Sequence, residues 1–211
     1  MPASEFACDP SKTAMLFFDT CNSSLHPTDA TMQAALNSYI GLLEKMNRAC
    51  RAVGLAVFYT RPEHRPDLKD WPRTIVDLGH HGEPGSGPRV SADPGSVAGT
   101  WEAQVIDEIA PQPGDYVITK HRWSSFHQTH LELSLRTAGI DTIMLAGGAT
   151  EVGIASTAYS ARDQGLNQII LRDACRSTKE GVNEFFMDRV FPIFARVRTV
   201  DEAIALFSHE S

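Results

Sequence analysis

The sequence lacks the features that mark several large classes of protein. Only 21% of its 211 residues are charged, the formal net charge is −7, and Lys and Arg are not clustered, which disfavours a nucleic-acid surface. No apolar run reaches the about 18 residues of a membrane span, and the N-terminus lacks a basic and then apolar leader. We therefore expect a soluble, cytoplasmic protein whose partner is a small molecule.

Paired cysteines and nucleotide-binding motifs are also absent. No CxxC pair occurs, so we expect four reduced thiols, at Cys8, Cys21, Cys50 and Cys175. No GxGxxG follows the first apolar run, and neither GxxxxGKS nor GxxxxGKT occurs. His64, His80 and His81 come without a DxH or HxxxH pattern and a matching carboxylate, so we expect histidines at the surface or pocket rim, with no metal and no cofactor.

Apolar runs and helical patterns alternate along the chain. This alternation predicts an α/β fold in one domain over residues 1–211, with a parallel sheet covered by helices on both faces. The expected strands are 13–19, 55–60, 116–120, 142–146, 167–173 and 197–200. The expected helices are 31–52, 100–110, 129–138, a helix ending at Gly165, 182–194 and 201–207. Residues 61–89 are rich in Pro, Gly and charge and form either a linker or, as we favour, a functional loop.

The stretch TIMLAGGATEVGIASTAY (residues 142–159) predicts a buried strand, a tight glycine turn and a helix. Thr150 and Glu151 can accept hydrogen bonds from the amides of the first helical turn. The positive start of the helix suits a reacting oxygen or a carboxylate. Gly153 occupies this position.

Two other strands end in charged residues. Asp19 follows the first strand, where open α/β sheets bind ligands, although an aspartate there is equally typical of a turn. Lys120 closes the strand YVITK, and taken alone it would be expected to extend into solvent. Each is a candidate only in combination with the glycine turn.

Together, three segments resemble the isochorismatase-like or cysteine hydrolase superfamily over roughly residues 13–177. These are the first strand ending in Asp19, the segment GTWEAQVIDEIAPQPGDYVITKHRWSSFHQTHLELSLRTAGI around Lys120, and GGATEVGIASTAYSARDQGLNQIILRDAC. The resemblance implies a three-layer Rossmann-like sandwich, a homodimer or homotetramer, and a cis peptide at Gly148–Ala149. It also implies a catalytic Asp, Lys and Cys, which fall on Asp19, Lys120 and Gly153.

Glycine at the third place departs from the commonest pattern of the superfamily. Without a thiol there, amide hydrolysis through a thioester is disfavoured. The isochorismatase branch, which cleaves a vinyl ether, resembles this chain in having glycine, and that reaction needs no covalent intermediate. Asp19 would then be the general acid, with Lys120 orienting it and binding a substrate carboxylate.

Further substrate-binding candidates surround this group: the amides near Val152 and Gly153 for a negative oxygen, and the residues Ala149, Arg61, Trp123 and Cys21. Pro62 stands where isochorismatases carry a glutamine, which argues against isochorismate itself. The open alternatives are an amidohydrolase using Cys21, Ser156, Thr157 or an activated water, and a non-catalytic binding or scaffold protein.

Overall fold

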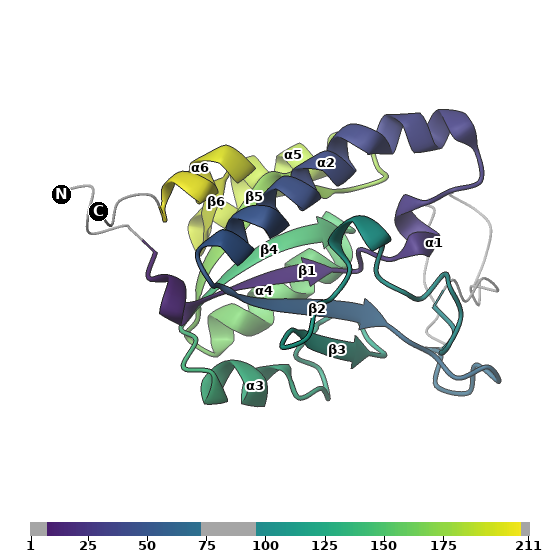
Figure 1. The fold of residues 1–211 in the computed structure, drawn as a ribbon, viewed down its shortest axis with the longest axis horizontal. Helices are drawn as coiled ribbons and strands as arrows, with labels where there is room; N and C mark the ends of the chain where they lie inside the picture. The colour runs from purple at the N-terminus through teal and green to yellow at the C-terminus, as the bar shows by residue number, and fades with distance from the viewer. Residues whose placement is uncertain (1–7, 73–95, 208–211) are drawn as a thin grey trace.

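The computed structural model describes residues 8–72 and 96–207, which form a six-stranded parallel sheet in the order β3-β2-β1-β4-β5-β6 (Figure 1). The strands are β1 (Thr13–Phe18), β2 (Ala56–Pro62), β3 (Tyr116–Lys120), β4 (Thr142–Gly148), β5 (Asn167–Arg176) and β6 (Arg196–Arg198). The predicted α/β class and the strand positions are therefore confirmed to within a few residues.

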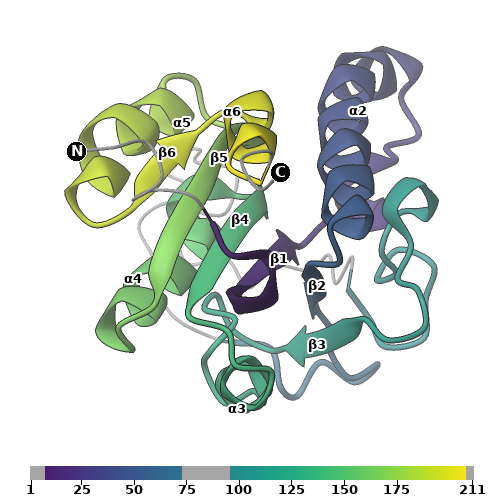
Figure 2. The same cartoon turned by 60° about the vertical axis from the view of Figure 1, so that its left-hand side comes forward.

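Helices cover both faces of this sheet. They are α1 (Asn22–Leu25), α2 (Ala30–Ala52), α3 (Leu131–Thr137), α4 (Ala155–Asp163), α5 (Val182–Phe185) and α6 (Val200–Ala205). Figures 1 and 2 show α2 and α6 on one face and α3 and α4 on the other. Within residues 8–72 and 96–207, no helix is long and apolar enough to cross a membrane.

The central strand β1 explains why the core has two halves. All six of its residues are buried, and alternate side chains point to opposite faces of the sheet. Met15 and Phe17 pack in the core beneath α2 and α6, where the Phe17 ring stacks on Tyr59 at 5.5 Å. Leu16 and Phe18 pack in the core beneath α3 and α4. A strand that is apolar on both sides must lie in the middle of a covered sheet.

The predicted helix at 100–110 is wrong, because only Asp107–Ile109 forms a short 3-10 turn. The backbone before it pairs with the chain after β1: Cys21 bridges Val105, and the Asn22 amide donates to the Gln104 carbonyl at 3.0 Å. These tertiary hydrogen bonds replace the local helical ones. The segment predicted as one helix at 182–194 is α5 followed by a π-helical turn and a 3-10 turn that contains Pro192.

Candidate functional site

Asp19 and Lys120 form an ion pair at the carboxyl edge of the sheet. Lys120 Nζ donates to Asp19 Oδ2 at 2.9 Å, within the range expected for a charge pair. The Lys120 side chain is only 4% exposed and that of Asp19 is 21% exposed. Lys120 therefore does not extend into solvent. Removal of either partner of this pair would leave the charge of the other without compensation.

The topology of the sheet places this pair. The chain runs from β1 outward through β2 to β3, then returns to β4 on the other side of β1. The carboxyl ends of β1 and β4 therefore lie at the point where the strand order reverses, which is where open α/β sheets bind ligands. Asp19 directly follows β1 with a positive φ of 51°, and its amide donates to the Thr60 carbonyl at 2.8 Å. This turn directs the carboxylate toward the end of β3.

The two carboxylate oxygens of Asp19 have different surroundings. Oδ2 accepts from Lys120, whereas Oδ1 is buried and makes no hydrogen bond within the described residues. Burial raises the pKa of Asp19 from its ordinary value of 3.8 to about 6, while the charge and hydrogen bond of Lys120 act in the opposite direction. The carboxyl group can therefore hold and release a proton near neutral pH.

Gly153 lies against the ring of Phe18. A Cβ added to Gly153 would stand 2.1 Å from Phe18 Cε1 and 2.2 Å from Phe18 Cζ, closer than atoms can pack. The same ring lies 4.4 Å beneath Lys120 Nζ, in a cation–π contact. The aromatic side chain thus fills the space that a thiol-bearing residue at position 153 would need, and it also supports the lysine.

The turn after β4 matches the expectation from the resemblance, because the Gly148–Ala149 peptide bond is cis. A π-helical turn (Thr150–Ile154) follows it and leads into α4. The amides of Val152 and Gly153 donate to the Ala149 carbonyl at 3.2 and 3.0 Å. An anion at these two amides would have to compete with that carbonyl, and their role in binding a negative oxygen remains a prediction.

The expected capping of this helix by Thr150 and Glu151 is wrong. The turn begins at Ala149 without a side-chain cap. Thr150 Oγ1 donates to the side chain of Asn183 at 2.7 Å, and Glu151 Oε1 lies 3.8 Å from Lys179 Nζ. The amides of Val152, Gly153 and Ile154 donate to the Ala149 carbonyl instead, so they are not available to a capping side chain.

The remaining candidates differ in their surroundings. Arg61 donates to the Ala103 carbonyl at 2.8 Å and pairs with Glu63 at 2.6 Å, so its charge already has a partner. Trp123 is exposed, in the connection after β3. Cys21 is buried at the start of α1, and its pKa is raised to about 12, first by burial and then by the charge of Asp19. A thiol in that state is a poor nucleophile.

One cluster escaped the sequence analysis. His64, Asp70 and His121 meet beside the ends of β2 and β3, with their ligand atoms within 4.8 Å of one another. The available signal was the position of His121 directly after Lys120 and of His64 two residues after β2, since neighbouring parallel strands end side by side. His80 and His81 lie outside the described residues.

Comparison with known proteins agrees with this geometry. The model of the isochorismatase domain matches residues 13–202. An uncharacterized isochorismatase family protein, YwoC of Bacillus subtilis (strain 168), is 40% identical over 108 residues, which are 51% of this chain and 57% of that protein. The chain matches only about half the length of this curated relative. N-carbamoylsarcosine amidase of an Arthrobacter species is 28% identical over 92% of this chain and 70% of its own length.

A solved structure shares the whole fold. An isochorismatase family protein from Burkholderia thailandensis superimposes with a TM-score of 0.77 and 26% identity, covering 96% of this chain and 98% of that one. Because the family model covers far more than half of the chain, membership does not depend on the shorter matches. The chain belongs to the isochorismatase family, a family of hydrolases.

Proposed function

We propose that this protein hydrolyses a small, carboxylated substrate without a cysteine nucleophile, with Asp19 as the general acid and Lys120 as its partner. Vinyl-ether hydrolysis suits these groups best. A homodimeric or homotetrameric assembly and a cytoplasmic location, both expected from the sequence, belong to the same proposal.

The observation that carries this proposal is the contact between Phe18 and Gly153. The ring leaves no room for a side chain at the position where the superfamily places its thiol. The acid and the lysine nevertheless remain paired at 2.9 Å at the ligand-binding edge of the sheet. A reaction that needs a proton donor but no covalent intermediate fits what is present.

In vinyl-ether hydrolysis, Asp19 would give up one proton and recover one in each turnover. Asp19 transfers a proton from Oδ1 to the terminal carbon of the vinyl group, giving an oxocarbenium ion and an aspartate. Water adds to the carbon that bears the ether oxygen and returns a proton to Asp19. The resulting hemiketal collapses to an alcohol and a ketone. Lys120 stabilises the transient aspartate and offers its charge to a substrate carboxylate.

A second candidate is an amidohydrolase that activates a water molecule or uses another nucleophile. The relative named N-carbamoylsarcosine amidase favours it, at 28% identity over most of this chain. Asp19 would then act first as a base, accepting a proton from the water. The state of Cys21, which is buried and whose pKa is raised to about 12, argues against that thiol as the nucleophile.

The decisive measurement is whether hydrogen from the solvent becomes bound to carbon in the product. The whole protein is incubated in D2O with a panel of carboxylated vinyl ethers and carbamoyl amides, and the products are analysed by mass spectrometry. Our proposal expects consumption of a vinyl ether, with one carbon-bound deuterium entering the ketone product per turnover. Consumption of amides alone, without deuterium on carbon, would establish the second candidate instead.

Variants assign the proton donor. Asp19→Asn should lower turnover by roughly 10²–10⁴-fold, the usual contribution of a general acid. The matched control is Asp201→Asn, which removes an exposed carboxylate that also pairs with a lysine, Lys45. Equal activity in the two variants would refute a catalytic role for Asp19, and no turnover of any compound by the wild type would favour a binding or scaffold protein.

A further inference from the structure

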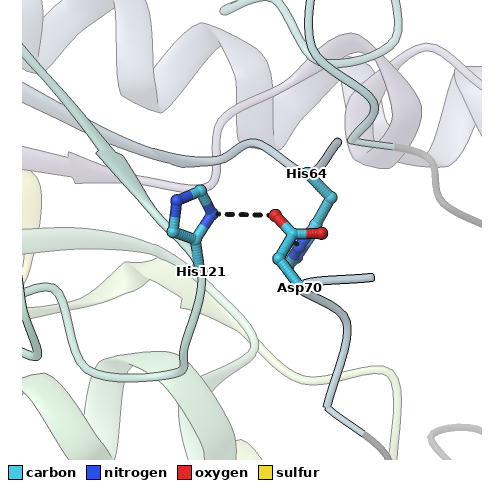
Figure 3. Close-up of side chains that lie close together, drawn as sticks. All are labelled: His64, Asp70 and His121. Atoms are coloured by element: carbon cyan, nitrogen blue, oxygen red, sulfur yellow. Dashed lines mark ion pairs between the residues drawn. The ribbon is translucent and has the colours of Figure 1, made fainter. Parts of the chain in front are cut away.

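The side chains of His64, Asp70 and His121 converge on one point outside the Asp19–Lys120 pair. His64 Nδ1 lies 3.4 Å and His121 Nδ1 lies 3.5 Å from the same oxygen, Asp70 Oδ2. Figure 3 shows the His121 ring directed at the Asp70 carboxylate, with the His64 ring behind it. Two imidazole nitrogens and one carboxylate oxygen therefore surround a shared space.

The backbone holds these three residues in place. The parallel register of β2 and β3 pairs Pro62 with Lys120, and the pairing continues as the Glu63 amide donates to the Lys120 carbonyl at 3.2 Å. His64 is fixed on its other side, since its amide donates to the Ser96 carbonyl at 2.7 Å. The pairing of β2 with β3 and its continuation at Glu63 therefore fix the positions of the His64 and His121 backbones.

Asp70 is positioned by a compact turn over residues 65–71. The Arg65 amide donates to both carboxylate oxygens, at 3.3 Å for Oδ1 and 3.2 Å for Oδ2. The Arg122 guanidinium donates to the Asp70 carbonyl at 3.0 Å and so ties this turn to the connection after β3. The His64 ring packs edge-on against Trp71, with ring centroids 4.6 Å apart.

One polar atom at the centre of this cluster, His64 Nδ1, has no hydrogen bond of normal length to a described residue. His64 is only 5% exposed, and its Nδ1 is buried without a hydrogen-bond partner within the described residues. An N–H···O hydrogen bond normally spans about 2.7–3.2 Å, and both distances to Asp70 are longer. His64 Nδ1 therefore has only a long ion-pair contact with Asp70, and a bound ion would give this buried nitrogen a closer partner.

The two distances to Asp70, 3.4 and 3.5 Å, match the edge of a tetrahedron around a metal ion, and all three ligand atoms lie within 4.8 Å of one another. With Zn–N and Zn–O bonds of about 2.0–2.2 Å, two ligands of a tetrahedral zinc ion lie about 3.4 Å apart. We propose that His64, Asp70 and His121 form a binding site for a divalent transition-metal ion of the Zn²⁺ type. His121 is 55% exposed, so the fourth position is open to water or to an oxygen of a bound molecule. This site replaces our sequence-based expectation of no metal.

The test is a titration of the chelator-treated whole protein with Zn²⁺ alone, followed by calorimetry, and with Co²⁺, followed by the visible absorption of a tetrahedral cobalt ion. We compare the wild type with His64→Ala, Asp70→Asn and His121→Ala. His127→Ala is the matched control, because His127 is an exposed histidine in the same connection after β3 but outside the cluster. Circular dichroism verifies that each variant is folded.

The proposal expects the wild type and His127→Ala to bind one ion, to show the cobalt band and to melt at a higher temperature when zinc is added. Each of the three cluster variants should bind at least about tenfold more weakly and lose the cobalt band. His121→Ala and Asp70→Asn alter partly exposed side chains, so they remain informative if His64→Ala fails to fold. Unchanged binding in these two variants, or no binding by the wild type, would overturn the proposal.

Discussion

The ring of Phe18 occupies the volume that a side chain on Gly153 would need. Phe18 is the last residue of β1, and Gly153 lies in the π-helical turn after β4, so the contact joins neighbouring strands at the edge where the candidate site lies. The ring also lies 4.4 Å beneath Lys120 Nζ. One aromatic side chain therefore both excludes a side chain at position 153 and contacts the ammonium group of Lys120.

We predict that a side chain at position 153 destabilises the protein unless Phe18 is made smaller. Gly153→Ala overpacks the site and should lower the free energy of unfolding by about 1–3 kcal/mol. Phe18→Ala should lower it by about 3–5 kcal/mol, because it leaves a cavity. The double variant should lose less than the sum, since the new methyl group enters that cavity. Urea unfolding of the four proteins measures the coupling.

Gly41→Ala is the control for this cycle. Gly41 lies inside α2, and a Cβ there would have no neighbour within 4 Å. Because alanine favours a helix, this change should raise the free energy of unfolding by about 0.5–1 kcal/mol. Strict additivity of Gly153→Ala and Phe18→Ala would show that the two positions do not compete for space.

The proposed role of Asp19 as proton donor gives a second prediction, the pH dependence of catalysis. Because the pKa of Asp19 is raised to about 6, mainly by burial, its acid form is lost as the pH rises through that value. For any substrate that is turned over, kcat/KM should be highest below about pH 6 and fall about tenfold per pH unit above it. A rate that instead rises through pH 6 would assign Asp19 the role of a base.

Stability should follow the same titration. The pKa of Asp19 is about 6 in the folded protein, above its ordinary value of 3.8, so the folded state binds this proton more tightly between the two values. The free energy of unfolding contributed by Asp19 therefore falls as the pH rises through this window. Unfolding at several pH values should show a steeper decline in the wild type than in Asp19→Asn, and equal slopes would contradict the raised pKa.

The fourth prediction concerns Cys21. Its thiol is 1% exposed, and the raised pKa keeps it protonated at neutral pH. Cys21→Ser should therefore retain turnover, and iodoacetamide should label the native protein slowly at all four buried cysteines. Mass spectrometry of native and urea-unfolded samples compares the labelling rates. Rapid native labelling at Cys21 with loss of turnover would restore a thiol mechanism.

The sequence was sufficient to place the catalytic candidates at strand ends. Asp19 and Lys120 each follow an apolar run, and in a parallel sheet such positions share one edge, so their pairing was predictable once the alternation of strands and helices was recognised. The turn after β4 was predictable for a similar reason, because two glycines separate a buried strand from a helical pattern.

What escaped prediction depends on contacts between distant segments. No periodic pattern indicates that Phe18 would reach Gly153, because both faces of β1 are apolar and either could have faced α4. The helix expected at 100–110 was lost to backbone pairing with the chain after β1. The His64, Asp70 and His121 cluster depends on the register of β2 and β3, which a single sequence does not specify.

The contact between Phe18 and Gly153 also constrains how this protein can evolve. A single substitution that introduces cysteine at position 153 meets the aromatic ring, and a single substitution that shrinks the ring first leaves a hole beneath Lys120. Either order passes through a less stable intermediate. Introduction of a thiol at position 153 therefore requires a coordinated change at Phe18, and a protein that changes only one of the two positions is expected to be less stable.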